Sequence, residues 1–411
     1  MTQTILPRPK EVKRPVDAER LPMAALLALA MTGFICIVTE TLPAGLLPQI
    51  GEGLGVTQSL AGQMVTAYAL GSLLAAIPLT IATRGWRRRN VLLLTIVGFL
   101  VFNSVTALSS NYWLTLMSRF FAGVAAGLAW SLLAGYARRM VAPHQQGRAM
   151  AVAMVGTPIA LSLGVPLGTW LGTLVGWRTA FGIMSLLTVA LIVWVRVKVP
   201  DYPGQSGREP LPLRRIFTTP GVRPVLGVVI AWMLAHNLLY TYVAPFVAPA
   251  GLAAQVDLVL LVFGLAALAS IWIVGRLVDR WLRAAVLVSL ATFALTALAL
   301  GLWGAWPLVV YAGVAVWGLT FGGAATLLQT ALADTAGDGA DVALSMNVVA
   351  WNSAIAGGGL LGGVLLETQG VASLPWAVLT LLLVGLWVAC SASSRGLPSG
   401  HRSSNTAVAG H

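Results

Sequence analysis

Long apolar runs alternate with short polar stretches along the whole chain. Most runs extend for about 20 residues, the length that an α-helix needs to span the roughly 30 Å hydrocarbon core of a bilayer. They break at glycine, proline and charged residues, and they form two sets of six around a polar stretch at 199–221. The predicted spans are 23–47, 57–82, 90–108, 112–136, 148–173, 178–197, 222–248, 256–278, 284–303, 306–332, 342–366 and 372–393. We therefore predict an all-α integral membrane protein of twelve transmembrane helices.

The same pattern divides the chain into two six-helix halves with polar connections. The predicted parts are an N-terminal tail at 1–21, a first half at 22–198, a linker at 199–221, a second half at 222–393 and a C-terminal tail at 394–411. The basic, proline-rich start is similar to a signal peptide. The apolar run after it is too long, however, and no A-x-A-like cleavage site follows. We expect a tail that leads into a retained first helix.

Composition supports a membrane protein. Of the 411 residues, 58% are hydrophobic and 9% are charged, whereas roughly a quarter of an ordinary soluble domain is charged. The 44 glycines fit membrane helices, whose backbones approach closely where side chains are small. Cys36 and Cys390 both fall in predicted spans, so neither supports a disulfide framework.

The basic residues predict the orientation. Of 25 lysines and arginines, all but Arg119 and Arg178 fall in loops or tails on one side of the predicted topology. Positive charge favours the cytoplasmic side, so we expect both termini and the linker in the cytoplasm. The net charge of +12 therefore reflects topology, and no continuous basic face predicts a nucleic-acid partner.

An internal repeat relates the two halves. The loop after the eighth span reads Gly-Arg-Leu-Val-Asp-Arg-Trp-Leu-Arg from Gly275. The loop after the second span has arginines at matching positions, because Arg84 and Arg87 precede Arg280 and Arg283 by 196 residues each. Two halves related by an axis along the membrane normal are a transporter architecture.

With these loops, three further motifs resemble the major facilitator superfamily, and within it the twelve-span drug:proton antiporters of bacteria. Span 4 has Arg119-x-x-x-Gly123-x-x-x-Gly127, and span 5 has Gly164-x-Pro166-x-Gly168-x-x-x-Gly172. Span 1 reads Thr-Glu-x-x-Pro-x-Gly-Leu-Leu-Pro from Thr39, which looks most like the sugar-efflux and purine-ribonucleoside-efflux branches.

The resemblance implies two pseudo-symmetric halves, alternating access and a set of residues that switch conformation. By the matching motifs these are Arg84, Arg87, Gly164, Pro166, Gly168, Asp279, Arg280 and Arg283. One position departs from the family, because Thr83 stands where an aspartate is usual while the second loop keeps Asp279. That departure puts the usual charge relay of the first loop in doubt.

Two charged residues lie deep in predicted spans. Glu40 is the only one of 13 acidic residues well inside a span, and Arg119 is the only basic residue there. A charged side chain within a membrane costs a few kcal/mol, about 2.5–3.5 on insertion scales for a central aspartate, and marks a functional site by default. Both lie about seven residues from the outer ends of their helices, roughly 10 Å deep at 1.5 Å per residue. We expect them to meet and to couple transport to protons. The alternatives are a glutamate anchored at the interface or a static ion pair.

Polar and aromatic side chains inside the spans are candidates for a substrate cavity. The predicted substrate-binding residues are Tyr68, Trp130, His236, Asn237, Tyr240, Gln329, Asn347, Trp351 and Asn352. Buried amides need partners, which a substrate, water or a neighbouring helix can supply. A lone histidine such as His236 titrates near neutral pH in water but is more often a structural donor.

These observations favour a proton-coupled exporter of a small organic solute: a sugar, a nucleoside or an amphipathic drug. An uptake symporter or a uniporter of the same fold is the alternative. A membrane-embedded enzyme lacks its chemistry, because the chain has no H-E-x-x-H motif and no paired membrane carboxylates, and it has no G-x-x-x-x-G-K-[ST] loop for ATP. We expect no cofactor and no metal. The expected partners are substrate, protons and membrane lipids, with the chain acting as a monomer.

Overall fold

The computed structural model describes residues 21–142, 145–204, 213–392 and 396–397, and every regular element in these ranges is a helix. The first half has five unbroken or nearly unbroken helices and one short one. They are α1 (Met23–Gly45), α2 (Leu47–Leu54), α3 (Gln58–Ala82), α4 (Arg88–Leu108), α5 (Tyr112–Arg139) and α9 (Trp177–Lys198). The fifth span is segmented into α6 (Gln146–Met154), α7 (Gly156–Ile159), the π-helix η3 (Ala160–Gly164) and α8 (Val165–Val175).

The second half begins after the short helix α10 (Leu213–Phe217). Its helices are α11 (Val222–Thr241), α12 (Val243–Val247), α13 (Val256–Trp303), α14 (Pro307–Phe321), α15 (Ala324–Ala336), α16 (Ala340–Thr368) and α17 (Leu374–Ser391). Three single turns of 3-10 helix join them at Ala248–Ala250, Ala253–Gln255 and Val371–Ser373, and a fourth at Gly337–Gly339 precedes α16.

Helix length confirms the predicted fold class. Eleven helical segments of the described chain are long and apolar enough to cross a membrane. One of them, Ala253–Trp303, has 51 residues, about twice the length of a span. Trp281 interrupts it with a non-helical backbone at φ −128° and ψ 29°. This segment therefore supplies two spans, and the described chain contains the twelve that the apolar runs predict.

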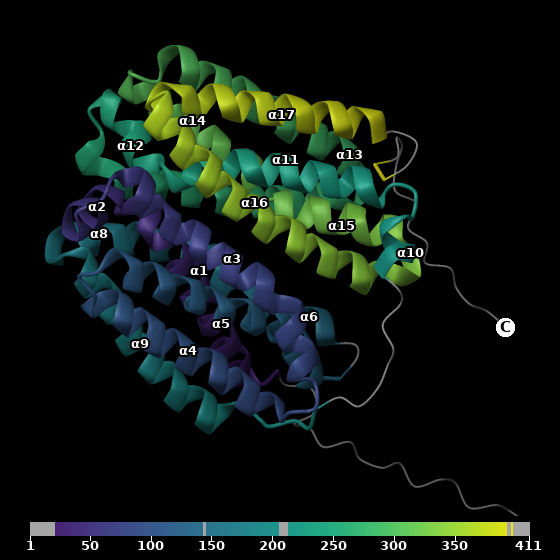
Figure 1. Ribbon diagram of the computed structural model, residues 1–411. Helices are drawn as coiled ribbons and strands as arrows, with labels where there is room; N and C mark the ends of the chain where they lie inside the picture. Colours follow the sequence, from purple (N-terminus) through teal and green to yellow (C-terminus); the bar gives the residue numbers. More distant parts are fainter. Residues whose placement is uncertain (1–20, 143–144, 205–212, 393–395, 398–411) are drawn as a thin grey trace, which may run out of the picture.

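The two halves form two helix bundles that meet at one end of the molecule. Figure 1 shows them converging where α2, α8 and α12 lie and diverging toward the end with α6 and α10. Across the junction α3 packs on α16, and η3 and α8 pack on α13. We refer to the first as the α2 end and to the second as the α10 end.

A π-helical turn interrupts the fifth span where it packs on the second half. Val165 donates its backbone N–H to the carbonyl of Ala160, five residues back, and Pro166 follows with no N–H to donate. The Cα of Ser162 and the carbonyl of Leu161 in this turn press on Gly264 of α13. Such π-turns are frequent at functional sites, and this one ends at Gly164, the first residue of the predicted switch motif.

Glycines set the closest helix contacts of the first half. A Cβ atom at Gly123 would overlap the carbonyl oxygen of Tyr68, and one at Gly156 would overlap that of Ala30. Gly123, Gly127, Ser131 and Gly135 recur every fourth residue and form a row of small residues on α5. At Gly123 this row lies directly on the backbone of α3. A Cβ atom at Gly135 would meet no atom within 4 Å.

This difference gives a prediction for one substitution made at two sites. Alanine has the higher helix propensity, by about 1 kcal/mol, so Gly135→Ala should keep or raise the apparent melting temperature in detergent. Gly123→Ala forces α5 away from Tyr68, and overpacking of this kind costs about 1–3 kcal/mol. We expect a clear fall in melting temperature for Gly123→Ala only. Equal melting temperatures of the two variants would contradict this packing.

Candidate functional site

Glu40 and Arg119 lie together in the first half, as their depths predict. Glu40 belongs to the last turns of α1 and is 8% exposed, while Arg119 of α5 is completely buried. Arg119 Nη2 donates hydrogen bonds to the backbone carbonyls of Thr39 at 2.6 Å and of Glu40 at 3.4 Å. Among the described residues no ion pair joins the Glu40 carboxylate to Arg119. The two residues meet through the backbone of α1.

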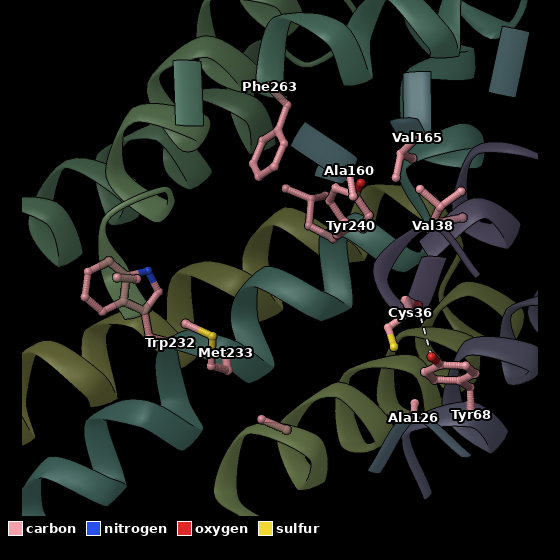
Figure 2. Packing of buried hydrophobic residues seen from close by; sticks show 14 of the residues in the cluster. Cys36, Val38, Tyr68, Ala126, Ala160, Val165, Trp232, Met233, Tyr240 and Phe263 are labelled. Carbon is pink, nitrogen blue, oxygen red and sulfur yellow. Dashed lines mark hydrogen bonds between the residues drawn. The ribbon is translucent and has the colours of Figure 1, made fainter. Parts of the chain in front are cut away.

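Aromatic rings enclose the Arg119 guanidinium. Its Cζ lies 4.9 Å from the ring centroid of Tyr68 and 5.5 Å from that of Phe181, distances at which a cation is attracted to a ring face. The Tyr68 hydroxyl donates to the carbonyl of Cys36 at 3.0 Å, as Figure 2 shows. Tyr68, predicted as a substrate contact, therefore holds α1 and covers Arg119.

Asn103 is part of this cluster, and the sequence analysis did not identify it. Its Nδ2 donates to the hydroxyl of Thr39 at 3.0 Å, and the side chain is fully buried. Thr39 is thus held at its side chain by α4 and at its carbonyl by α5. An amide in the middle of the predicted span 90–108 was the available signal, because a buried amide in a membrane needs a partner.

The second half carries an uncharged aromatic cluster around His236. Trp317 Nε1 donates to His236 Nδ1 at 3.1 Å, and the Phe321 ring stacks on the imidazole with centroids 3.4 Å apart. Tyr240 and Phe263 lie 5.2 and 5.7 Å away, centroid to centroid. Because Nδ1 accepts a hydrogen bond, the imidazole is in the form that carries its proton on Nε2. In this form the imidazole can donate a hydrogen bond through Nε2.

The other predicted substrate contacts are dispersed over α5, α11, α15 and α16. Asn237 and Asn352 each donate to a backbone carbonyl one turn earlier in their own helices. Asn347 is buried with an unsatisfied Oδ1. Trp351 lies 6.5 Å from Phe321, centroid to centroid.

Gln329 is exposed, and Trp130 packs near Gly33 of α1. The structure brings together His236, Tyr240 and, through Phe321, Trp351. Trp130, which packs on α1, and the exposed Gln329 lie outside this cluster.

Tyr240 connects the two clusters. Its ring lies 5.4 Å from that of Phe263, and Figure 2 shows both pointing into the space between the bundles. Its buried hydroxyl lies near Thr41 and Glu40 of α1, where α1 packs on α11. Glu40 is the one buried carboxylate among the described membrane helices, and it belongs to a helix that packs on the second half.

Hydrogen bonds close the junction at the α2 end. Gln63 Nε2 of the first half donates at 3.2 Å to two oxygens of the second half, the Tyr242 hydroxyl and the Gly359 carbonyl. Within the second half the Tyr242 hydroxyl donates to the same carbonyl at 2.7 Å. The hydroxyl of Ser59 donates to the Gly363 carbonyl at 3.0 Å. The sequence analysis named none of these residues as switch positions, because the pairing joins residues from opposite halves.

The basic loop after α3 binds the start of the linker. Arg87 Nε donates to Asp201 Oδ2 at 2.5 Å, and the Arg89 backbone N–H donates to Oδ1 at 3.1 Å. Partial burial disfavours the carboxylate, but these donors and the charges of the two arginines hold the pKa of Asp201 below its ordinary value. Asp201 thus supplies a carboxylate to a loop whose own aspartate is replaced by Thr83.

The matching loop in the second half has a different role for its last arginine. Arg283 donates to the backbone carbonyls of Ala389 at 3.3 Å and of Leu397 at 2.6 Å. This arginine ties the Trp281 corner to the end of α17. Asp279 and Arg280 are exposed, so the loop presents both charges to its surroundings.

Two six-helix bundles joined at one end are the architecture of a membrane transporter. The family model of the Major Facilitator Superfamily matches residues 29–359, so the chain belongs to that superfamily. It is a multi-pass membrane transporter of small molecules, and the family predicted from the motifs is confirmed.

Relatives and a solved structure agree with this family. The purine ribonucleoside efflux pump NepI of Shigella sonnei strain Ss046 is 29% identical over 379 residues, 91% of this chain and 96% of that protein. The transcription regulatory protein OpdE of Pseudomonas aeruginosa is 30% identical over 388 residues, 92% of this chain and 95% of that protein. A bacterial homologue of the human lysosomal transporter Spinster, solved in an inward-facing and unoccupied conformation, has the same fold. It gives a TM-score of 0.67 at 14% identity over 91% of this chain and 97% of its own.

The contacts at the α2 end predict the effect of removing one hydroxyl. Tyr242→Phe deletes the hydroxyl that accepts a hydrogen bond from Gln63 across the junction at 3.2 Å, and a hydrogen bond contributes about 0.5–1.5 kcal/mol. The state open at the α2 end should therefore gain population about two- to tenfold. The measurement is the rate at which a cysteine at Ser59 reacts with a maleimide dye, in a background lacking Cys390.

Tyr311→Phe is the matched control. The Tyr311 hydroxyl donates to Gln255 within the second half at 2.8 Å, so its loss leaves the junction intact. Faster labelling after Tyr311→Phe, or unchanged labelling after Tyr242→Phe, would show that the Tyr242 hydroxyl does not hold the halves together.

Proposed function

We propose that the chain is a proton-coupled exporter that moves a small organic solute across the bacterial cytoplasmic membrane by alternating access. The observation that carries this proposal is the burial of the Glu40 carboxylate on α1, a helix that packs on α11 of the second half, with Tyr240 of α11 close by. A group at that place contacts both bundles whenever they close around it.

Protonation of Glu40 links the proton to the change of state. A carboxylate sealed among helices is costly, whereas the neutral acid is far less so. A closed junction therefore favours the protonated form, and a state that admits water favours the carboxylate. A ligand or proton shifts a conformational equilibrium only by its differential affinity for the two states, and Glu40 has such a difference. Arg119 of α5 holds the turn of α1 that carries Glu40 through hydrogen bonds to its backbone.

For the substrate, purine ribonucleosides are the first class to test. Several relatives, including the one in Shigella sonnei, are named purine ribonucleoside efflux pumps. His236, Tyr240 and Trp317 form a buried aromatic cluster, and the buried Oδ1 of Asn347 has no hydrogen-bond partner. A planar base would stack on these rings once they separate from one another. Sugars and amphipathic drugs complete the panel.

The charge distribution supports one orientation of the bundle. We infer that the α10 end and both termini face the cytoplasm, because 23 of 25 basic residues fall on that side of the topology. Reporter fusions at His411 and within 205–210, positions outside the described residues, should both give cytoplasmic signals. A periplasmic signal from either fusion would reverse the topology and the direction of export with it.

The central prediction concerns Glu40→Gln, which mimics the protonated acid. Proteoliposomes with an imposed pH gradient and a pH dye inside should show adenosine-coupled proton movement for the wild type and none for the variant. Downhill exchange of adenosine should persist, because the substrate contacts remain. With one such carboxylate, the simplest stoichiometry is one proton per cycle, so export of a neutral nucleoside would be electrogenic.

Glu52→Gln provides the same chemical change at an exposed carboxylate of α2 and should retain full coupling. Gradient-driven transport by Glu40→Gln at the wild-type rate would remove Glu40 from the mechanism. Accumulation of adenosine in the direction of the proton flow would instead identify an uptake symporter.

A further inference from the structure

The α1 helix has a built-in defect one turn beyond Thr39. Pro43 lies inside the helix, and proline has no N–H to donate to the carbonyl four residues earlier. That carbonyl belongs to Thr39. Within a membrane an unsatisfied backbone carbonyl costs several kcal/mol, so a partner must come from outside the helix.

Arg119 supplies that partner. Its Nη2 donates to the Thr39 carbonyl at 2.6 Å, the shorter of its two hydrogen bonds to α1. The other two donor positions of the guanidinium, Nε and Nη1, are buried and have no hydrogen-bond partner. The hydrogen bonds of this buried cation thus go to the backbone at the helix defect, with none to the neighbouring carboxylate.

The same turn is fixed from a second side. Asn103 Nδ2 donates to the Thr39 hydroxyl at 3.0 Å, so α4 and α5 hold one residue at two different atoms. Glu40 follows Thr39 directly, and its carboxylate position is determined by the backbone of this turn. Contacts that fix Thr39 therefore fix the place of Glu40.

We propose that Arg119 is a positioning residue that replaces the helix hydrogen bond removed by Pro43, and that it acts on Glu40 through the Thr39 carbonyl rather than as the counter-ion of the carboxylate. This proposal rests on the proposed function only for the role of Glu40. The backbone contact itself is independent of transport, so a stability measurement tests it separately.

The first test restores the missing N–H. Pro43→Ala gives the helix its own donor to the Thr39 carbonyl, and Arg119→Met removes the guanidinium while keeping an unbranched apolar side chain. The apparent melting temperature in detergent should fall by several degrees for Arg119→Met, and most of that loss should be recovered in the double variant. A counter-ion would give no recovery, because alanine at 43 supplies no charge. A double variant as unstable as Arg119→Met would overturn the proposal.

The second test removes the charge that a counter-ion would pair with, and it needs no change at Pro43. If Arg119 serves the backbone, Arg119→Met should lower the melting temperature equally in the wild-type and Glu40→Gln backgrounds. If the loss disappears in Glu40→Gln, Arg119 acts through the carboxylate and the proposal is wrong. This outcome is readable even when Pro43→Ala fails to fold.

A third measurement separates positioning from general stability. The pH dependence of adenosine-driven proton movement should be shifted in Arg119→Met. In the double variant Arg119→Met/Pro43→Ala it should match that of Pro43→Ala alone. A merely stabilising contact would change the amount of active protein and leave the profile unmoved. If Glu40→Gln proves fully coupled, the proposed function fails, while the two melting-temperature tests still decide the role of Arg119.

Discussion

In a bilayer core no water completes the hydrogen bonds of the backbone, so each carbonyl and N–H must find its partner within the protein. This constraint makes every regular element of the described chain a helix, and it governs the places where the helices are imperfect. Pro43 removes a donor from α1, and Arg119 of α5 reaches the orphaned Thr39 carbonyl at 2.6 Å. Before Pro166 the chain takes the other solution, a π-turn that shifts the hydrogen-bond register by one residue. Each repair lies next to a surface on which the two halves meet.

The contact between the halves is made largely of backbone and small residues. Gly359 and Gly363 bring α16 against Thr66 and Gln63 of α3, and Gly264 brings α13 against the π-turn. Surfaces without long side chains separate without breaking interlocked packing, and only a few hydrogen bonds then decide which state is stable. In such a junction a single hydroxyl contributes energy comparable to the difference between two states. The transport cycle can be biased by small changes at the α2 end.

Much of this architecture was predictable from the sequence. The apolar runs predicted the twelve spans, because span length is set by bilayer thickness, and depth counting predicted that Glu40 and Arg119 would meet. The manner of their meeting was not predicted, since an ion pair was the simplest expectation for opposite charges. Pro43, four residues after Thr39, contained the missing information. Asp201, Gln63 and Tyr242 were overlooked for another reason: their partners are distant in the chain, so no local pattern marks them.

The two halves share a fold but differ in chemistry. The first contains the buried acid and the buried cation, and the second contains an uncharged aromatic cluster in which His236 accepts from Trp317. Such an acceptor bond at Nδ1 opposes a second proton on the ring, so the histidine is poorly suited to carry one. In the proposed function, proton binding belongs to α1 and recognition of a planar solute to the second half, and Tyr240 lies in the aromatic cluster and near Glu40. Because a ligand acts on the equilibrium only through contacts that differ between states, a residue at that boundary is where the two binding events can influence each other.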